Sequence, residues 1–130
     1  DISVVCGEPE RASDDKYGFV NPTLLVEVSS PSTESYDRGE KFDYYRTLAS
    51  LRDYLLVSQH EPLLTLFCRD EKTGLWSSRE HGAGEQVRIK SVGLRIAVDR
   101  VYEGITLEPR PPRRAGLLVV KQPPLAYSTQ

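Results

Sequence analysis

The strongest hydrophobic pattern in the chain is a short apolar run from Thr23 to Ser29 that contains a single charge. Bounded by Asn21-Pro22 and Ser30-Pro31, this run predicts a strand buried on both faces of a sheet. Glu27 is its only charged residue. A carboxylate at the centre of a buried strand costs several kcal/mol unless it is protonated, hydrogen-bonded, paired with a cation or bound to a metal. All four explanations are open at this point, and Glu27 is the first candidate functional residue.

The next segment, about Tyr36–Ser50, has the periodicity of an amphipathic helix. At a step of about 100° per residue, Lys41 falls on the same side as Tyr45, within the apolar stripe, and Asp37 shares that face one turn earlier. The connection between strand and helix is short, so we expect them to be neighbours that each direct a charge inward. The alternative is that Lys41 reaches solvent along the edge of the stripe and that Asp37 only favours the start of the helix.

The rest of the pattern predicts a mixed sheet of short strands. The fold class is therefore α+β, or α/β in the broad sense, with a mixed central sheet, a flanking helix and a C-terminal hairpin. Residues 8–21 are polar and predict a loop or a loose hairpin tip. Further strands are expected at Asp1–Cys6, Asp53–Ser58, Leu63–Cys68, Leu75–Ser78 and Gln86–Ile89, and the segment Leu94–Tyr102 is expected to end in a brief helix from Val98.

The composition is that of one soluble domain followed by a tail. The chain has 130 residues, of which 38% are hydrophobic and 28% charged, enough for a single core. From Pro109 the sequence becomes rich in proline and arginine. Residues 1–108 are therefore predicted to form the core, and residues 109–130 a Pro/Arg-rich tail or arm. The chain has no methionine and opens on Asp1 inside a predicted strand, so we expect a fragment or processed product that lacks an N-terminal region.

Charge and cysteine content narrow the functional classes. The net charge of −2 gives no broad basic surface, so tight binding to nucleic acid by charge alone is not expected, whereas a small site or a metal bridge remains open. Cys6 and Cys68 lack zinc-site spacing and are predicted to be buried free thiols in a cytoplasmic protein. No apolar run approaches the roughly 20 residues needed to span a bilayer, so no membrane partner is expected.

Two carboxylates and one lysine suggest a metal site. A hard cation such as Mg²⁺ prefers oxygen ligands and retains several waters, so two carboxylates from neighbouring strands suffice to hold it. Asp1 and Glu27 form such a pair if their strands are adjacent. Lys41 would then orient or deprotonate an attacking water, or stabilise charge on a phosphate. The combination predicts phosphoryl chemistry more specifically than carboxylates alone.

Four segments, in the same order, resemble a known family. They are Asp1–Val5 (DISVV), Pro22–Thr33 (PTLLVEVSSPST), Asp37–Tyr45 (DRGEKFDYY) and Leu51–Val57 (LRDYLLV). The chain is similar over about residues 1–108 to the Uma-two family of restriction endonucleases, a bacterial class long labelled a domain of unknown function. The resemblance implies a restriction-endonuclease-like fold of the PD-(D/E)XK nuclease type. It also implies Mg²⁺-dependent hydrolysis, with Mn²⁺ as an alternative, of phosphodiester bonds in DNA.

The resemblance also implies roles for individual residues. Asp1 and Glu27 would be the two metal ligands. The lysine expected two residues after the glutamate is replaced by Ser29, and Lys41 on the helix would take its place, as in the family's own shifted pattern. The proline that normally precedes the aspartate lies outside the chain.

Weaker candidates and alternative functions remain open. Ser29 shares a strand face with Glu27, and Gln59 follows the third strand, so both are candidates to line the site. The alternative for Ser29 is a buried serine bonded to the backbone, and the alternative for Gln59 is a glutamine that is simply solvated.

A catalytically inactive nuclease fold that serves as an interaction module is the main alternative to an endonuclease. A purely structural ion pair between Glu27 and Lys41 is a third reading. An enzyme that cuts both strands of DNA would be expected to work as a homodimer.

Overall fold

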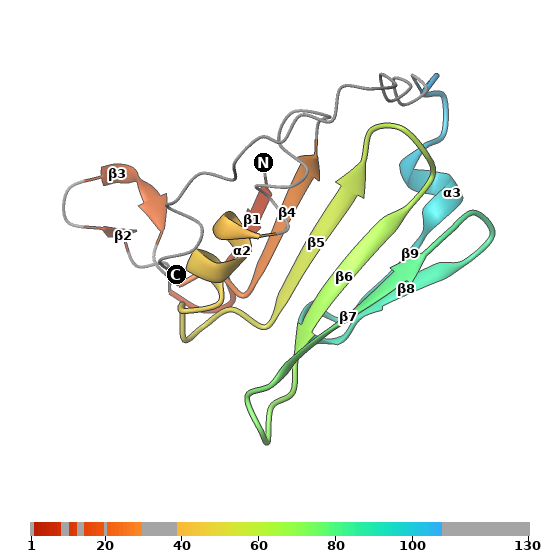
Figure 1. Cartoon of the computed structure of the whole chain (residues 1–130). Helices are drawn as coiled ribbons and strands as arrows, with labels where there is room; N and C mark the ends of the chain where they lie inside the picture. Colours follow the sequence, from red (N-terminus) through yellow and green to blue (C-terminus); the bar gives the residue numbers. More distant parts are fainter. Residues whose placement is uncertain (1, 9–10, 13–14, 20, 30–38, 108–130) are drawn as a thin grey trace, which may run out of the picture.

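A five-stranded mixed sheet forms the centre of the molecule (Figure 1). The computed structural model describes residues 2–8, 11–12, 15–19, 21–29 and 39–107. In these residues the sheet has the order β1-β4-β5-β6-β7. Its strands are β1 (Ile2–Val4), β4 (Leu24–Ser29), β5 (Asp53–Ser58), β6 (Leu64–Arg69) and β7 (Trp76–His81). The predicted α+β class with a mixed sheet is therefore confirmed.

The smaller elements surround this sheet. The polar segment predicted as a loop or hairpin tip contains a two-stranded hairpin with an irregular register. The predicted strand at residues 86–89 and the short helix from Val98 are confirmed. The helix is preceded by a strand at residues 94–97 that the sequence did not predict. These elements are β2 (Arg11–Ala12), β3 (Asp15–Phe19), α2 (Glu40–Tyr45), β8 (Gln86–Ile89), the 3-10 turn η1 (Lys90–Val92), β9 (Leu94–Ala97) and α3 (Val98–Val101).

One parallel strand pair determines where α2 lies. β4 and β5 are parallel, with Glu27 opposite Leu56, whereas β1, β6 and β7 are joined by antiparallel pairs. A parallel pair needs a crossover connection, and α2 lies in that connection. Phe42 of α2 packs with Leu25 of β4 and Leu56 of β5, so α2 lies against the two central strands, as the sequence predicted.

The two faces of the sheet contact different elements. Because side chains alternate along a strand, Leu24 and Leu25 belong to separate cores. The core beneath α2 consists of Leu25, Phe42, Leu51, Tyr54 and Leu56. The core on the opposite face joins the central strands to β8 and α3 and consists of Leu24, Leu55, Leu64, Leu66, Val87, Ile89 and Val98.

The expectation that β4 is buried on both faces is wrong at its C-terminal end. Val28 is 45% exposed, because β8, β9 and α3 cover only part of that face. The uncovered part is an apolar groove of about 710 Å³. Its lining residues include Val26, Val57 and Ile105. Tyr102 also lines the groove, and its hydroxyl donates a hydrogen bond to the Ser58 carbonyl at 2.6 Å.

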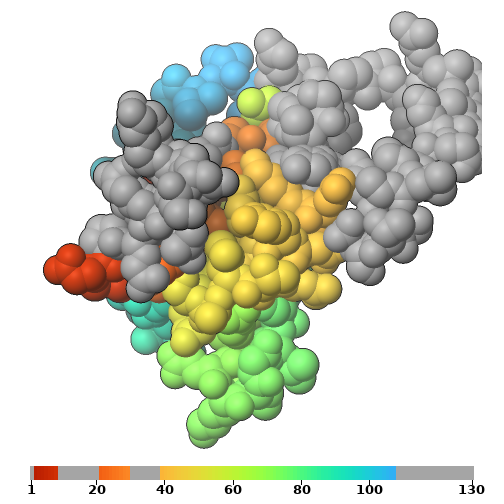
Figure 2. Space-filling model, turned by 90° about the vertical axis from the view of Figure 1, so that its left-hand side faces the viewer, coloured from red at the N-terminus to blue at the C-terminus, as the bar shows by residue number. Residues whose placement is uncertain are grey.

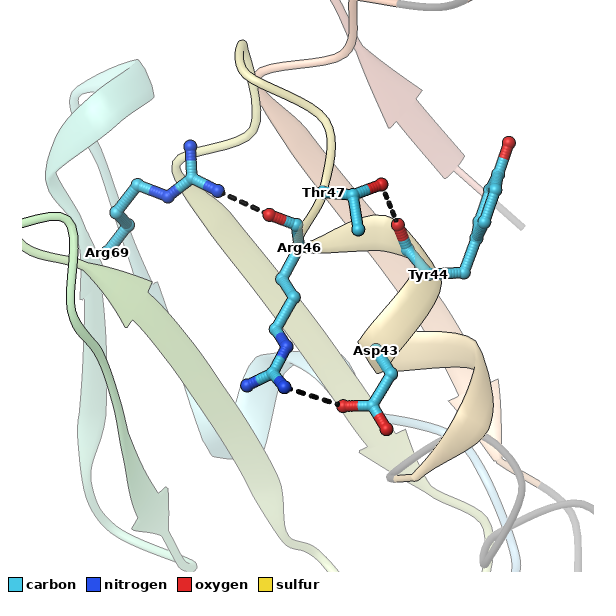
Figure 3. A network of polar contacts seen from close by, with 5 residues as sticks. All are labelled: Asp43, Tyr44, Arg46, Thr47 and Arg69. Atoms are coloured by element: carbon cyan, nitrogen blue, oxygen red, sulfur yellow. Dashed lines mark hydrogen bonds and ion pairs between the residues drawn. The ribbon is translucent and has the colours of Figure 1, made fainter. Parts of the chain in front are cut away.

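The helix is shorter than the predicted range Tyr36–Ser50. α2 covers Glu40–Tyr45, and the residues after it form turns that reach the surface next to the helix (Figure 2). Residues 36–38 lie outside the described residues. Figure 3 shows why the helix ends where it does: the Thr47 hydroxyl donates to the Tyr44 carbonyl at 2.6 Å, and Arg69 donates to the Arg46 carbonyl at 2.6 Å. Side chains therefore bind the carbonyls that a longer helix would have used.

Arg69 holds the whole turn that follows α2. Its guanidinium also donates to the carbonyls of Leu48 and Ala49, at 3.4 and 3.2 Å, and lies over the Trp76 ring at 4.8 Å. Burial lowers the pKa of Arg69, with a further contribution from the nearby Arg52. The planar fork of an arginine allows one side chain to reach several carbonyls at once.

The two cysteines occupy different environments. Both are free thiols, as predicted, but Cys6 is exposed and only Cys68 is partly buried, so the expectation of two buried thiols is wrong for Cys6. Cys6 follows the end of β1, where the chain leaves the sheet. Among the described residues no helix has the length and apolar content needed to cross a bilayer.

Replacing Arg69 with lysine is expected to destabilise the protein by about 2–4 kcal/mol, because one ammonium cannot replace three carbonyl contacts and the stacking on Trp76. Chemical denaturation would measure this loss. Arg100→Lys is the matched control, since Arg100 is exposed and should change stability by less than about 0.5 kcal/mol. Equal stabilities of the two variants would show that Arg69 does not hold the turn.

The two thiols are expected to react at different rates with a disulfide reagent at pH 8. Burial, followed by the charge of Asp53 nearby, raises the pKa of Cys68, so less of its reactive thiolate is present. Cys6 should react at least about tenfold faster than Cys68 in the folded protein, and both should react alike in guanidinium. Cys6→Ser should remove only the fast phase, and a single rate for both thiols in the native protein would contradict the structure.

Candidate functional site

Glu27 and Lys41 form the centre of the candidate site. Glu27 lies in the second half of β4 on the face that α2 covers, and it is only 6% exposed. Lys41, in the first turn of α2, places its Nζ 2.6 Å from the Glu27 Oε1. The inward lysine and the buried glutamate predicted from the sequence therefore meet. Of the explanations open for the buried carboxylate, pairing with a cation is present in the structure.

Tyr45 is the third member of this cluster. It follows Lys41 by one helical turn, so both side chains leave α2 on the same face. Its hydroxyl donates to the Glu27 Oε1 at 3.5 Å, and the Lys41 Nζ lies 5.9 Å from the centre of its ring. The sequence pattern placed Tyr45 in the apolar stripe but did not reveal its bond to Glu27. The spacing of four residues between Lys41 and Tyr45 was the available signal.

Aromatic packing determines the position of α2 above Glu27. Phe42 is buried, and its ring centroid lies 5.4 Å from Tyr54, 4.5 Å from Phe67 and 5.2 Å from Trp76. These contacts fix the side of the helix next to Lys41. The ion pair consequently borders an apolar core, where charges are less screened than in water.

The face becomes polar toward the C-terminal ends of β4 and β5. Beyond Glu27, Ser29 is buried and donates to the Val57 carbonyl at 3.3 Å. Ser58 is also buried, and its hydroxyl accepts a bond from the His60 backbone N–H at 3.2 Å. Ser29 therefore lies on the same face as Glu27, as predicted, and its bond is to backbone.

The other predicted site residues lie elsewhere or outside the described residues. Gln59 is exposed and lines the apolar groove, which lies on the opposite face from α2. Asp1 and Asp37 lie outside the described residues. The register nevertheless pairs Ile2 with Val26, so β1 is the direct neighbour of β4. The strand that begins at Ile2 is therefore adjacent to the strand that carries Glu27, and the pairing of Asp1 with Glu27 stays a prediction.

The donor atoms at this site suit a hard divalent cation. Magnesium sites in proteins commonly use one or two carboxylates, several waters and oxygens of the substrate. Glu27 supplies one carboxylate, and an ionised carboxylate can accept at about four positions, so its pair with Lys41 does not by itself prevent coordination. The described part of the chain contains no cluster of three or more His, Cys, Asp or Glu side chains, so a dense metal cage is absent there.

The Uma2 family profile, described as "Putative restriction endonuclease", matches residues 1–99. The protein "Uncharacterized protein slr1290" of Synechocystis sp. (strain ATCC 27184 / PCC 6803 / Kazusa) is 41% identical over 105 residues, which are 81% of this chain and 54% of that protein. "Uncharacterized protein sll1609" of the same organism is 37% identical over 59 residues, 45% of this chain and 33% of that protein. The chain thus spans about half the length of the first relative.

The match covers every element from β1 to β9 and includes Glu27, Lys41 and Tyr45. It agrees with the mixed sheet and with the helix that covers the two parallel strands. On this match, the chain belongs to the Uma2 family of restriction-endonuclease-like proteins.

Proposed function

We propose that this protein is a metal-dependent endonuclease that hydrolyses phosphodiester bonds in DNA. Asp1 and Glu27 would hold Mg²⁺, for which Mn²⁺ can substitute, and Lys41 would assist the reaction. The observation that carries the proposal is the 2.6 Å contact between Lys41 and the buried Glu27, made by two elements of a restriction-endonuclease family. A carboxylate that can hold a metal ion and an ammonium that can neutralise charge on a phosphate are groups that promote phosphoryl transfer to water.

Lys41 has a defined task in this proposal. Its ammonium has three N–H donors, so it can keep one bond to Glu27 and direct another at a phosphate oxygen or an attacking water. Water would add to phosphorus while the bond from phosphorus to the leaving sugar oxygen breaks. The attacking water would lose a proton to solvent, and the leaving sugar oxygen would gain one from solvent. A divalent ion held by Asp1 and Glu27 would neutralise further charge on the phosphate and favour loss of a proton from the attacking water.

Tyr45 and Ser29 have supporting tasks. The Tyr45 hydroxyl bonds to the same oxygen as Lys41 and limits the rotation of the carboxylate. Ser29 occupies the position where the family resemblance expects a lysine, and its bond to the Val57 carbonyl joins β4 to β5. In this proposal, Lys41 of α2 supplies the ammonium beside Glu27 that a lysine on β4 would otherwise supply.

The main alternative is a catalytically inactive nuclease fold that acts as an interaction module. Ser29 in place of lysine and the net charge of −2 favour it. A third reading gives Glu27 and Lys41 only a structural role as a buried ion pair. The three readings differ in whether metal binds, whether DNA is cut and how much stability depends on the pair.

Thermal unfolding with and without Mg²⁺ or Mn²⁺ tests the metal site directly. We expect millimolar metal to raise Tm for the wild type and not for Glu27→Gln, because a ligand that binds only the folded state stabilises it. Glu103→Gln is the control, since Glu103 is exposed and follows α3, which packs on the opposite face of the sheet from α2. The absence of any shift in the wild type would contradict the metal site.

Two substitutions separate catalysis from stability. Lys41→Met should reduce cleavage of DNA by at least about a hundredfold and keep the metal-induced rise in Tm, whereas Glu27→Gln should lose both. Because the Lys41 side chain is 25% exposed, water can replace part of the lost pair, and Glu27→Gln should cost less than about 2 kcal/mol. A loss of about 3–5 kcal/mol without any metal effect would instead support a structural pair.

A further inference from the structure

The described residues around the ion pair differ in exposure between the β5 side and the β1 side. Glu27 is only 6% exposed, and on the β5 side Phe42 closes the site by its contacts with Tyr54 and Phe67. On the other side, Ser3 stands opposite Leu25 and its side chain is directed to the face that α2 covers, yet Ser3 is exposed. Ser3 of β1 and Tyr44 of α2 are thus both exposed.

Tyr44 lies on an exposed side of α2. Figure 3 shows its ring leaving the helix on the side away from Arg69, which approaches from β6. It is 65% exposed, and its ring centroid lies 5.6 Å from that of Tyr45, whose hydroxyl reaches Glu27. The side chain of Tyr45 thus lies between Tyr44 and the candidate catalytic carboxylate of Glu27.

The backbone that carries Tyr44 is firmly held. Its carbonyl accepts two bonds from Thr47, one from the hydroxyl at 2.6 Å and one from the backbone N–H at 3.1 Å. Both come from the turn that Arg69 anchors by its bond to the Arg46 carbonyl. An exposed aromatic side chain on a fixed backbone loses little conformational freedom when a flat ligand binds, because it has only two side-chain torsions.

We infer that Tyr44 is the residue on which a base of the substrate stacks, next to the bond that is cleaved. This inference rests on the proposed nuclease function. Stacking requires a base whose face is accessible, so the substrate class is DNA that is single-stranded or locally unpaired at the cleavage position. Lys41 lies one helical turn before Tyr44, so one nucleotide can place its phosphate near Lys41 and a base over the Tyr44 ring.

Binding of a fluorescent single-stranded oligonucleotide and of the matching duplex tests the inference. The measurements use the full chain with Ca²⁺ in place of Mg²⁺, and cleavage is followed separately with Mg²⁺. Tyr44→Ala should weaken single-strand binding about 5- to 150-fold, which corresponds to about 1–3 kcal/mol for one stacked base. Tyr44→Phe and Tyr44→Trp should retain the affinity, because each keeps an aromatic face.

Leu75→Ala is the matched control, since Leu75 is another large, exposed apolar residue, 71% accessible, in the turn between β6 and β7. It should leave binding and cleavage unchanged. If the wild type cuts DNA and Tyr44→Ala binds and cuts single strands equally well, the inference is wrong while the nuclease function stands. If the wild type neither binds nor cuts any DNA, the proposed function itself fails. A preference for duplex that Tyr44→Ala preserves would also overturn the inference.

Discussion

The contact between the Glu27 carboxylate and the Lys41 ammonium is the interaction on which the candidate site depends. A carboxylate that is 6% exposed would be costly without a partner, and Lys41 supplies one only because α2 lies directly against β4. A pair of this kind contributes little net stability, since the removal of both groups from water offsets most of their attraction.

Contacts distant in sequence keep α2 in place. A helix of six residues is too short to be stable alone, so its position is set by the packing of Phe42 on β5, β6 and β7 and by the bonds from Arg69 to the turn that follows. Both anchors lie on the side of β5. Lys41 and Tyr45 can therefore face Glu27, while Tyr44 stays exposed.

The two faces of the sheet have separate properties. The face beneath α2 changes from an aromatic core to the polar group of Glu27, Ser29 and Ser58 at the ends of the parallel strands. The opposite face carries the apolar groove that includes Val28 and Gln59. A single-residue step along β4 or β5 moves a side chain from one of these surfaces to the other, because strand side chains alternate.

The sequence by itself determined the α+β class, most strands, the family and the meeting of Glu27 with Lys41. The family follows from the resemblance of four sequence segments and not from periodicity. The strands and the meeting of Glu27 with Lys41 follow from local periodicity: a charge in an apolar strand and a lysine in an apolar helix stripe that comes soon after it. Only the tertiary structure decided the end of α2 at Tyr45, the exposure of Val28 and the bond from Tyr45 to Glu27. The end of α2 depends on the bond from Arg69, and the exposure of Val28 depends on how much of the sheet β8, β9 and α3 cover. The bond from Tyr45 depends on the packing of α2 against β4. All three are set by contacts between distant segments, which no local pattern encodes.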